Sequence, residues 1–439
     1  MADGSISLRG ERTDWPRSLW AATAAPAPAI SPPNGLAETD VAIVGAGYLG
    51  CSAALHLAEA GLRVVVLDAA APGWGASGRN NGQVIPGLKH DPRAVEAMLG
   101  RDSGARLAAW AGRAPDLVFD LIARHGIDCA ALRRGWIQPA YSAAALATIE
   151  TRCADWQARG ADVELLRREA LPALLGTDAF HGGWIDRRGG SIQPLSYARG
   201  LARAALAAGA VIHAPAAVVG LERMGAHWRL AMRNAQVLAD KVILATSAYG
   251  TLLPELARAV VPVRSAQAAT RPLGANMLAT ILPQRHVASD TRRLLTSFRI
   301  SPDGRLVMGG NGASGGAEHP ALLRHLHRAA QELFGHFGAL EWEFGWSGYL
   351  AITADHLPHI YEPQDGLLAG IGCNGRGIAV STALGKLIAE RLLGRDARDL
   401  EVPVVRMRPF VFHRLRHLGI AAATRWSRLR DARERAASR

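Results

Sequence analysis

Three glycines near the start of the chain have the spacing of a phosphate-binding turn. Gly45, Gly47 and Gly50 form the pattern GxGxxG within the segment GAGYLG. The first glycine permits a tight turn, the second lets a pyrophosphate approach the backbone, and the third lets a helix pack closely on a strand. Tyr48 lies inside the motif, and Asp68 follows Gly45 by 23 positions, where a carboxylate can accept hydrogen bonds from ribose hydroxyls. This spacing predicts dinucleotide binding; the alternative is a tight turn in another α/β sheet.

The elements around this motif are those of a βαβ unit. The apolar run at residues 41–44 predicts a strand buried on both faces. We expect a helix from Tyr48 to Ala60, ended by Gly61, and a second strand from Arg63 to Leu67. Because the helix begins at the motif, its unpaired N–H groups and partial positive charge would face the phosphates.

A second glycine-rich segment, GWGASGRNNGQ at residues 73–83, indicates which dinucleotide would bind. A NAD-binding chain would continue into its next βαβ repeat, whereas here a hydrogen-bonding loop follows the ribose-binding strand directly. Such a loop can wrap a phosphate and the edge of an isoalloxazine ring, which favours FAD; the alternative is a flexible surface loop. The cofactor contacts expected from this loop are Ser77, Gly78, Arg79, Asn80, Asn81, Gly82 and Gln83.

A third glycine-rich turn, GIGCNGRG at residues 370–377, precedes a predicted helix from Ile378 to Leu393. The N–H groups of the turn and the dipole of the helix would face negative charge. The alternative is a glycine-rich helix cap with no ligand. The cofactor contacts expected from this turn are Gly372, Asn374, Gly375, Arg376, Gly377 and Ile378.

Taken together, these segments resemble the flavoproteins of the glycine/D-amino acid oxidase superfamily. The resemblance rests on DVAIVGAGYLG, VVLDAAAPGWGASGRNNGQV, WIDRRGGSIQPLSYARGLARAA and GIGCNGRGIAVSTALGKLIAE, in that order, and runs from about Ser18 to about Gly394. The γ-glutamylputrescine oxidase and L-pipecolate oxidase branch is the most similar. The resemblance implies non-covalent FAD. The cysteine that some relatives attach to flavin is missing before Thr353, and the early loop has Gly78-Arg79 where others have histidine.

The pattern of elements indicates an α/β fold with a nucleotide domain assembled from separate segments. The resemblance implies a Rossmann-like FAD-binding domain, discontinuous in sequence, with an inserted mixed-sheet (α+β) substrate domain. Strands are expected at Ala214–Arg223 and Leu238–Thr246, with Val218 near the adenine and Thr246 near the cofactor. The expected division is an extended N-terminal arm at 1–37, FAD-binding segments at 38–90, 186–250 and 351–395, substrate-binding segments at 91–185 and 251–350, and a basic tail at 396–439.

The activity that the resemblance implies is oxidation of a C–N bond in an amine or amino acid. Hydride would pass from the carbon beside the nitrogen to flavin N5, and the resulting imine would hydrolyse. Oxygen is the expected electron acceptor, and quinone is the alternative. Such chemistry needs a well-placed substrate more than it needs a catalytic triad. The candidate substrate contacts are Arg299, Trp346, Tyr349, His356 and Arg376, each with core or surface packing as the alternative.

Two positions depart from the relatives. Some amine oxidases of this superfamily use a lysine near the flavin to promote reaction with oxygen, and residues 261–350 contain none, which puts fast oxidase behaviour in doubt. Arg376 stands where the γ-glutamylputrescine oxidase type tends to have histidine, which weakens transfer of that substrate. The choice among pipecolate-like, N-alkylated and polyamine-derived substrates stays open.

Charge and composition narrow the class of protein. The net charge is +12, but residues 405–439 hold +8 of it, with ten arginines against two acidic residues, so the rest of the chain is nearly balanced. The four cysteines lie far apart and predict neither a disulfide framework nor a zinc site, and no metal is expected. Because a secretory signal pattern and a long apolar run are both missing, we expect a cytoplasmic protein.

The basic tail leaves three alternatives open. Its segment FVFHRLRHLGIAAATRWSRLR mixes large apolar residues with arginine and histidine. A terminal helix that packs its apolar face on the body is favoured. Peripheral contact with an anionic membrane is the second alternative and would suit a quinone-linked dehydrogenase. A tRNA-modifying flavoenzyme is the remote third, but nucleic acid is not an expected partner because no RNA-binding motif appears.

Overall fold

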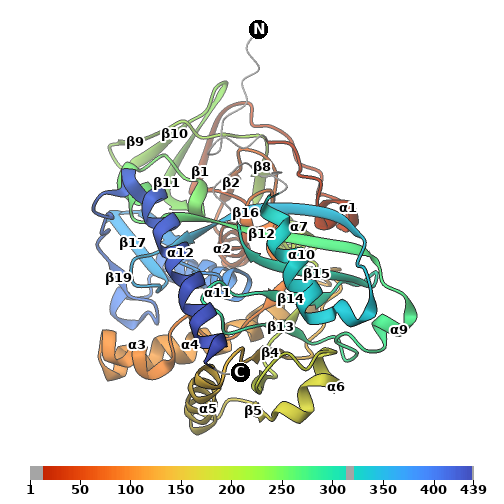
Figure 1. Cartoon of the computed structure of the whole chain (residues 1–439). Coiled ribbons are helices and arrows are strands. Elements are labelled where there is room, and N and C mark those ends of the chain that lie inside the picture. The colour runs from red at the N-terminus through yellow and green to blue at the C-terminus, as the bar shows by residue number, and fades with distance from the viewer. Residues whose placement is uncertain (1–12, 313–320, 438–439) are drawn as a thin grey trace.

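The computed structural model describes residues 13–312 and 321–437 of the chain. Two large β-sheets with helices packed against them make up this part (Figure 1). The first sheet has nine strands and the second has eight. The expected α/β fold with a discontinuous nucleotide domain and an inserted mixed sheet is confirmed.

The first sheet is built around the predicted βαβ unit. The helix α2 (Tyr48–Glu59) connects β1 (Gly35–Val44) to β2 (Val64–Leu67), and the two strands pair in parallel. Side chains alternate between two cores: Val41 and Ile43 face one, and Ala42 and Val44 face the other. The remaining strands are β8 (Val211–His213), β9 (Gly220–Met224), β10 (His227–Ala231), β11 (Ala235–Leu244), β17 (His359–Gln364), β18 (Leu367–Ile371) and β19 (Val404–Val405).

Helices from three separate segments cover one face of this sheet. They are α2, α7 (Pro194–Ala207) and α11 (Gly377–Leu392), and their small side chains let the backbones approach closely. The helix predicted at 378–393 is thus confirmed as α11. Helix α4 (Arg101–Arg124) joins the same core, although the predicted division placed 91–185 in the substrate domain. The apolar stripe of α4 packs against α11, and the position of α4 in the sequence does not reveal this contact.

The second sheet has strands from both inserted segments, mostly in antiparallel pairs. Its helices are α5 (Ala143–Ala158), α6 (Leu171–Leu175) and α10 (Ala321–Phe334), and α6 and α10 pack on the core that contains Phe298. The strands, in spatial order, are β16 (Trp342–Ile352), β12 (Val261–Pro272), β15 (Arg305–Asn311), β14 (Ser297–Ile300), β13 (Val287–Ser289), β4 (Trp136–Pro139), β6 (Gly183–Asp186) and β5 (Val163–Leu166).

Two predicted elements differ from the structure. The strand expected at Ala214–Arg223 is present only from Gly220 on, because β8 ends at His213 and β9 begins at Gly220. Pro215 lacks the N–H that a continuing ladder needs, and the N–H of Ala216 instead binds the carbonyl of Asp68 at 2.7 Å. The strand expected at 238–246 is present as β11, with earlier limits.

The N-terminal arm is also more ordered than predicted. Leu19–Thr23 form a short helix, α1, because Ser18 caps it by accepting a hydrogen bond from the N–H of Ala21 at 3.1 Å. Trp20 is fully buried, and its ring lies 5.7 Å from that of Trp346 in an edge-on arrangement. The arm therefore contributes to the core beside the glycine-rich loop.

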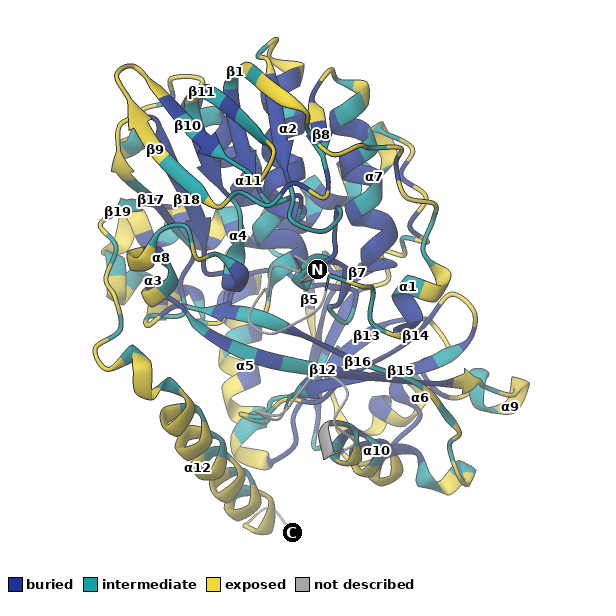
Figure 2. Cartoon of the chain, turned by 90° about the horizontal axis from the view of Figure 1, so that it is seen from above, coloured by how far each residue is buried: buried dark blue, intermediate teal, exposed yellow. Residues whose placement is uncertain are grey.

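The predicted tail forms two ordered elements. Strand β19 adds to the edge of the first sheet beside β17, and α12 (Arg416–Ala436) follows as a helix that runs across the outside of the molecule. Figure 2 shows α12 as an almost wholly exposed helix. The favoured expectation that this helix buries its apolar face is wrong, because no residue of α12 is buried.

Candidate active site

One cavity of about 1060 Å³ brings the three glycine-rich motifs together. Its size lies at the upper end of the roughly 300–1,000 Å³ typical of small-molecule sites, as a dinucleotide together with a substrate requires. The predicted contacts that line it are Gly45, Gly47, Tyr48, Asp68, Ser77, Arg79, Asn80, Asn81, Gln83, Val218, Thr246, Tyr349, His356, Gly372, Asn374, Gly375, Arg376, Gly377 and Ile378. Five predicted residues lie behind this wall: Gly50, Gly78, Gly82, Arg299 and Trp346.

The first motif has the close packing that its glycines predict. Gly45 has φ of +108°, and a Cβ there would lie 2.7 Å from the carbonyl oxygen of Ala245. A Cβ at Gly50 would lie 1.9 Å from the carbonyl oxygen of Gly45, so the helix can approach the strand only without a side chain. Asp68 accepts a hydrogen bond from the N–H of Ala46 at 2.7 Å, which holds its carboxylate at the cavity wall.

The second motif is braced from behind by residues distant in sequence. Ser77 Oγ accepts a hydrogen bond from the N–H of Tyr48 at 3.1 Å, which ties the loop to the start of α2. Trp20 Nε1 donates to the carbonyl of Asn80 at 2.7 Å. Gly82 has φ of +79° and lies against the guanidinium of Arg299, which leaves no room for a side chain. These contacts fix the loop along one side of the cavity.

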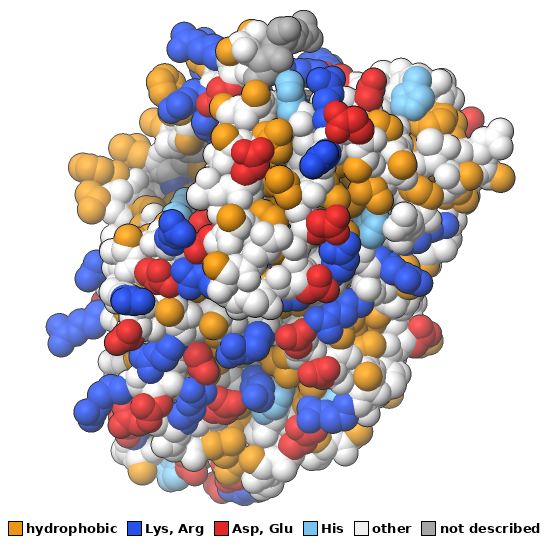
Figure 3. Space-filling view, turned by 90° about the horizontal axis from the view of Figure 1, so that it is seen from below, with side chains coloured by type: hydrophobic (Ala, Val, Ile, Leu, Met, Phe, Trp, Pro, Cys, Tyr) orange, Lys and Arg blue, Asp and Glu red, His pale blue; other side chains and the backbone are white. Residues whose placement is uncertain are grey.

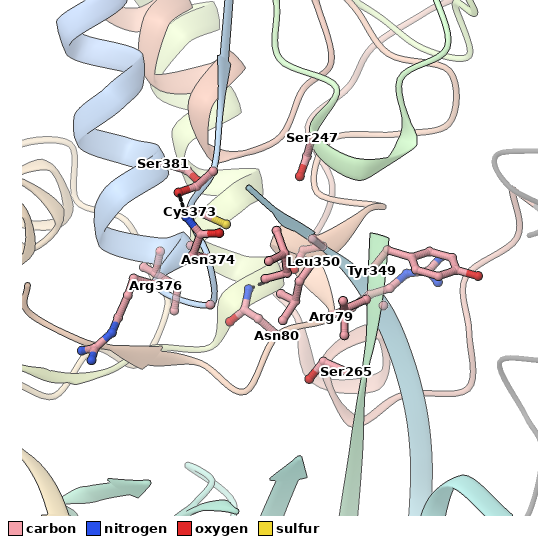
Figure 4. Close-up of a pocket in the computed structure, with 18 of the residues that line it drawn as sticks. Arg79, Asn80, Ser247, Ser265, Tyr349, Leu350, Cys373, Asn374, Arg376 and Ser381 are labelled. Atoms are coloured by element: carbon pink, nitrogen blue, oxygen red, sulfur yellow. Dashed lines mark hydrogen bonds between the residues drawn. The ribbon is translucent and has the colours of Figure 1, made fainter. Parts of the chain in front are cut away.

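The third motif forms a tight turn before α11. Gly372 and Asn374 both have positive φ, at +86° and +47°. The side chain of Asn374 closes the turn: Oδ1 accepts from the N–H of Thr353 at 3.0 Å, and Nδ2 donates to the carbonyl of Gly372 at 2.6 Å. Asn374 and Asn80, from segments far apart in the sequence, line the same cavity (Figure 4).

The residues present fit FAD. Helices α2 and α11 both begin at the cavity, and neither N-cap residue, Gly47 or Arg376, accepts a side-chain hydrogen bond from its first turn. Apart from the N–H of Tyr48, which binds Ser77 Oγ, the N–H groups of these first turns can bind negatively charged parts of FAD at two places. Burial raises the pKa of Asp68, although hydrogen bonds from backbone N–H groups act to lower it.

Two of the candidate substrate contacts belong to the interior instead. Arg299 is 1% exposed, and its Nη1 donates to the carbonyls of Gly82 and Ile192 at 2.8 and 2.6 Å. Burial lowers the pKa of this guanidinium to about 9. Trp346 is buried as well, and its Nε1 donates to the carbonyl of Arg79 at 2.9 Å. Both predictions are wrong because β14 and β16 turn these side chains toward the back of the loop.

Tyr349 and His356 do line the cavity. The hydroxyl of Tyr349 accepts a hydrogen bond from Arg264 Nη2 at 2.6 Å, and Figure 4 shows the side chain extending away from Asn374. The ring of His356 lies 6.0 Å from that of His90. Burial lowers the pKa of His356, and the positive charge of Lys89 lowers it further, so the imidazole is neutral at pH 7.

Arg376 and Lys89 add positive charge to one part of the cavity wall. Arg376 donates from Nη1 to the carbonyl of Pro86 at 2.8 Å, and its guanidinium lies 4.8 Å from the centre of the Trp136 ring. Burial and then the nearby Arg152 lower its pKa to about 10. The pKa of Lys89 is lowered by burial and then by Arg376 and Arg152. Within the described residues Lys89 has no hydrogen bond or ion pair.

Sequence reasoning missed Lys89. The comparison with relatives predicts an active-site lysine within 261–350, whereas Lys89 follows the glycine-rich loop by a few residues and reaches the cavity from there. It is one of only three lysines in the chain, and that scarcity was a usable signal.

The outer part of the cavity was also not predicted. Helix α5 lines it with side chains one turn apart, and α12 adds Ala423, Ser427 and Glu434 from the C-terminal segment. Glu434 binds Arg293 by an ion pair of 2.7 Å and accepts a hydrogen bond from the hydroxyl of Tyr141. A segment far beyond the last glycine motif therefore helps to enclose the site.

Comparison with known proteins agrees with these observations. Residues 40–391 match the family DAO, described as FAD dependent oxidoreductase. The chain is 31% identical over 364 residues to γ-glutamylputrescine oxidoreductase of Escherichia coli K12, covering 82% of this chain and 84% of that protein. It is 30% identical over 377 residues to the probable oxidoreductase OrdL of Rhizobium meliloti, covering 84% and 87%.

Solved structures share the fold. The crystal structure of glycine oxidase from Geobacillus kaustophilus superposes with a TM-score of 0.71 at 23% identity, covering 85% of this chain and all of that one. The L-amino acid deaminase of Proteus myxofaciens has the same TM-score at 16% identity, covering 85% of this chain and 94% of that one. With the family match over most of its length, this chain belongs to the DAO family of FAD-dependent oxidoreductases.

Proposed function

We propose that this chain oxidises the C–N bond of an amine or amino acid that carries a negatively charged group, with bound FAD as the oxidant. The γ-glutamylputrescine oxidoreductase, glycine oxidase and L-amino acid deaminase to which it is similar are named for nitrogen-containing substrates. The inference that the substrate is negatively charged rests on one observation: Lys89 and Arg376 both line the cavity.

The positive charges of Lys89 and Arg376 favour binding of an anion. Arg152 lines the same cavity, but its charge is balanced by an ion pair with Asp91 at 2.5 Å. Lys89 and Arg376 have no ion pair with a carboxylate among the described residues, and the charge of Arg376 lowers the pKa of Lys89. A carboxylate on the substrate would relieve this repulsion and accept charge-assisted hydrogen bonds from both side chains.

The remaining predicted site residues divide into two roles. The cofactor-binding group would hold FAD without a covalent bond: Asp68 at the ribose, the start of α2 at the pyrophosphate, and the turn before α11 at the flavin. Cys373 lines the cavity, but burial raises the pKa of its thiol and so disfavours the reactive thiolate. When bound, FAD supplies the group that accepts the hydride.

His356 suits the task of removing a proton from the substrate nitrogen. Its lowered pKa leaves the imidazole neutral at pH 7, and a neutral imidazole can accept the proton of a substrate ammonium. The unprotonated amine is the form that can lose hydride from the adjacent carbon. Lys89 and Arg376 would meanwhile hold the distant anionic group and orient the substrate.

Oxygen is the electron acceptor we propose, with quinone as the alternative. The doubt about oxygen came from the absence of lysine in residues 261–350, and Lys89 reaches the cavity from another segment. We also propose a cytoplasmic location, because all four cysteines are free and so match a reducing compartment.

The experiment is to mix the purified flavoprotein anaerobically with paired amines that differ only in a carboxylate, and then to admit air. Faster bleaching of the flavin band near ~450 nm by the acidic member of each pair is the expected result for a bound flavin reduced by its substrate. Rapid return of colour in air identifies oxygen as acceptor, and slow return that a quinone accelerates identifies the alternative. Equal bleaching by the acidic and the neutral amine of a pair would refute the proposal that the substrate is anionic.

A further inference from the structure

Helix α12 and Leu415, the residue just before it, turn their large apolar side chains toward solvent. Leu415, Leu418, Trp426 and Leu429 are 56%, 68%, 59% and 50% exposed. They recur three or four residues apart, with Ala422 between them, so they form one stripe along the helix. We call these five residues the outer stripe. A stripe of this size on a monomer marks an interaction surface.

The opposite side of α12 faces the body of the protein through polar contacts. Asp431 and Glu434 are the two acidic residues of the helix, and both bind Arg293, at 2.9 and 2.7 Å. Arg435 adds an ion pair with Glu332 at 3.0 Å. These contacts fix which side of the helix points outward, and they turn both of its negative charges inward.

The outward surface of α12 is consequently basic as well as apolar. Arg414, Arg425, Arg428 and Arg433 are exposed beside the outer stripe, and Phe412, just before the helix, is 76% exposed. By contrast, basic and acidic side chains are interspersed on the face shown in Figure 3. Because both acidic side chains of α12 bind Arg293 on the body, the outward surface of the helix carries unopposed arginine charge.

We propose that α12 binds the surface of an anionic lipid bilayer, with the outer stripe in the headgroup region. Leucine and tryptophan bury apolar surface there while the tryptophan N–H stays hydrated, and arginines on either side pair with anionic headgroups. Among the described residues no helix is long and apolar enough to span a bilayer, so α12 lies along the surface.

Charge decides between the bilayer and a second copy of this chain. Two copies that meet through the outer stripe would bring the arginines of one helix against those of the other, whereas anionic headgroups neutralise them. The bilayer surface would also lie next to the cavity, because Ala423 and Ser427 on the inner side of α12 line it. The inference goes beyond the proposed reaction, and lipid binding is measured without substrate.

The test is co-sedimentation of the full-length FAD-loaded protein with vesicles of phosphatidylcholine alone or mixed with phosphatidylglycerol. We expect binding to the mixed vesicles only, weakened by salt. The double variant Leu418→Glu and Trp426→Glu should lose this binding. Met224→Glu is the matched control, since Met224 is 52% exposed on the body and should leave binding unchanged. Each of Arg414→Gln, Arg425→Gln and Arg428→Gln should weaken binding about fivefold.

Other outcomes would overturn the proposal. The assignment of the outer stripe to the bilayer would be refuted if the wild type bound both vesicle types equally or bound neither. It would also be refuted if the double variant bound as well as the wild type. A wild type that elutes as a dimer without lipid, and a double variant that elutes as a monomer, would assign the outer stripe to a second copy. Flavin content and bleaching by substrate, measured on the same samples, separate these failures from a failure of the proposed reaction.

Discussion

The two ends of the cavity are built in different ways. At the dinucleotide end, backbone shape does most of the work: Gly45 and Gly50 let α2 pack on β1, and N–H groups face the ligand. At the substrate end, side chains from distant segments meet, with Lys89, Arg376 and Glu434 contributed by three different parts of the chain. The first end therefore tolerates little change in shape, whereas the second can change its specificity by single charges.

The largest effect should come from adding a methyl group at the dinucleotide end. Gly50→Ala would put a Cβ 1.9 Å from the carbonyl oxygen of Gly45, where two backbones already touch. We expect the free energy of unfolding to fall by about 3 kcal/mol and flavin to be lost. Urea denaturation and the ratio of flavin to protein absorbance measure both.

Gly274→Ala is the matched control for that change. No atom lies within 4 Å of a Cβ at Gly274, so stability and flavin content should stay as in the wild type. Full flavin content in Gly50→Ala would mean that close packing of α2 on β1 is dispensable, and the contrast between the two ends would fail.

A single charge at the substrate end should alter specificity without altering the fold. Arg376→Gln removes a charge-assisted hydrogen bond to the substrate anion, so KM for an acidic amine should rise about 10- to 100-fold. The KM for the matching neutral amine should barely move. Steady-state kinetics with the paired amines measure this, and a loss shared equally by both would place Arg376 outside substrate recognition.

Arg299 should behave as part of the dinucleotide end although it is a charged residue. Arg299→Met leaves the buried carbonyl of Ile192 without a donor, while the carbonyl of Gly82 keeps the N–H of Ile192 at 2.9 Å, so the free energy of unfolding should fall by about 1.5 kcal/mol. KM for the acidic amine should change less than that of Arg376→Gln. A rise in KM with unchanged stability would reverse this assignment.

The charge of Lys89 should make substrate affinity depend on pH. Burial and neighbouring arginines lower its pKa from the ordinary 10.5, so the positive charge, and with it affinity for an acidic amine, is lost as pH rises through that lowered value. Lys89→Arg keeps the charge at this position to higher pH, so the loss of affinity should move to higher pH. Binding titrations of the acidic amine across alkaline pH compare the two, and identical profiles would contradict the assignment.

The smallest effect concerns the segment between β16 and β17. Burial raises the pKa of Asp355, but the hydrogen bond and charge of His359 outweigh it and lower the pKa to about 2. Because its pKa is lowered in the folded state, the Asp355 carboxylate contributes its full stabilisation at pH values above its ordinary pKa of 3.8. This contribution is lost as the pH falls through about 2. The Asp355→Asn variant should therefore lose less than about 1 kcal/mol at pH 7, because the pair is partly exposed.

Acid denaturation curves of the two proteins test this prediction. The difference in their free energies of unfolding should be constant at neutral pH and vanish toward about pH 2. A difference that persists at low pH would mean that Asp355 acts by packing.

The sequence by itself determined the dinucleotide end. Phosphate binding depends on short-range geometry, so the order of glycines at 45–50, 73–83 and 370–377 was enough to predict the βαβ unit, α11 and the lining of the cavity. The same local rules failed at 214–223, where Pro215 interrupts a run that otherwise favours a strand.

Only the tertiary structure decided the substrate end and the C-terminal helix. Whether an arginine binds substrate or braces a loop depends on what its strand faces, so Arg299 and Arg376 were indistinguishable by residue type. Lys89 reached the cavity from an unexpected segment. The amphipathic pattern of α12 was visible in the sequence, but which side faces the body depends on ion pairs between residues more than 130 positions apart, such as Arg293 and Asp431.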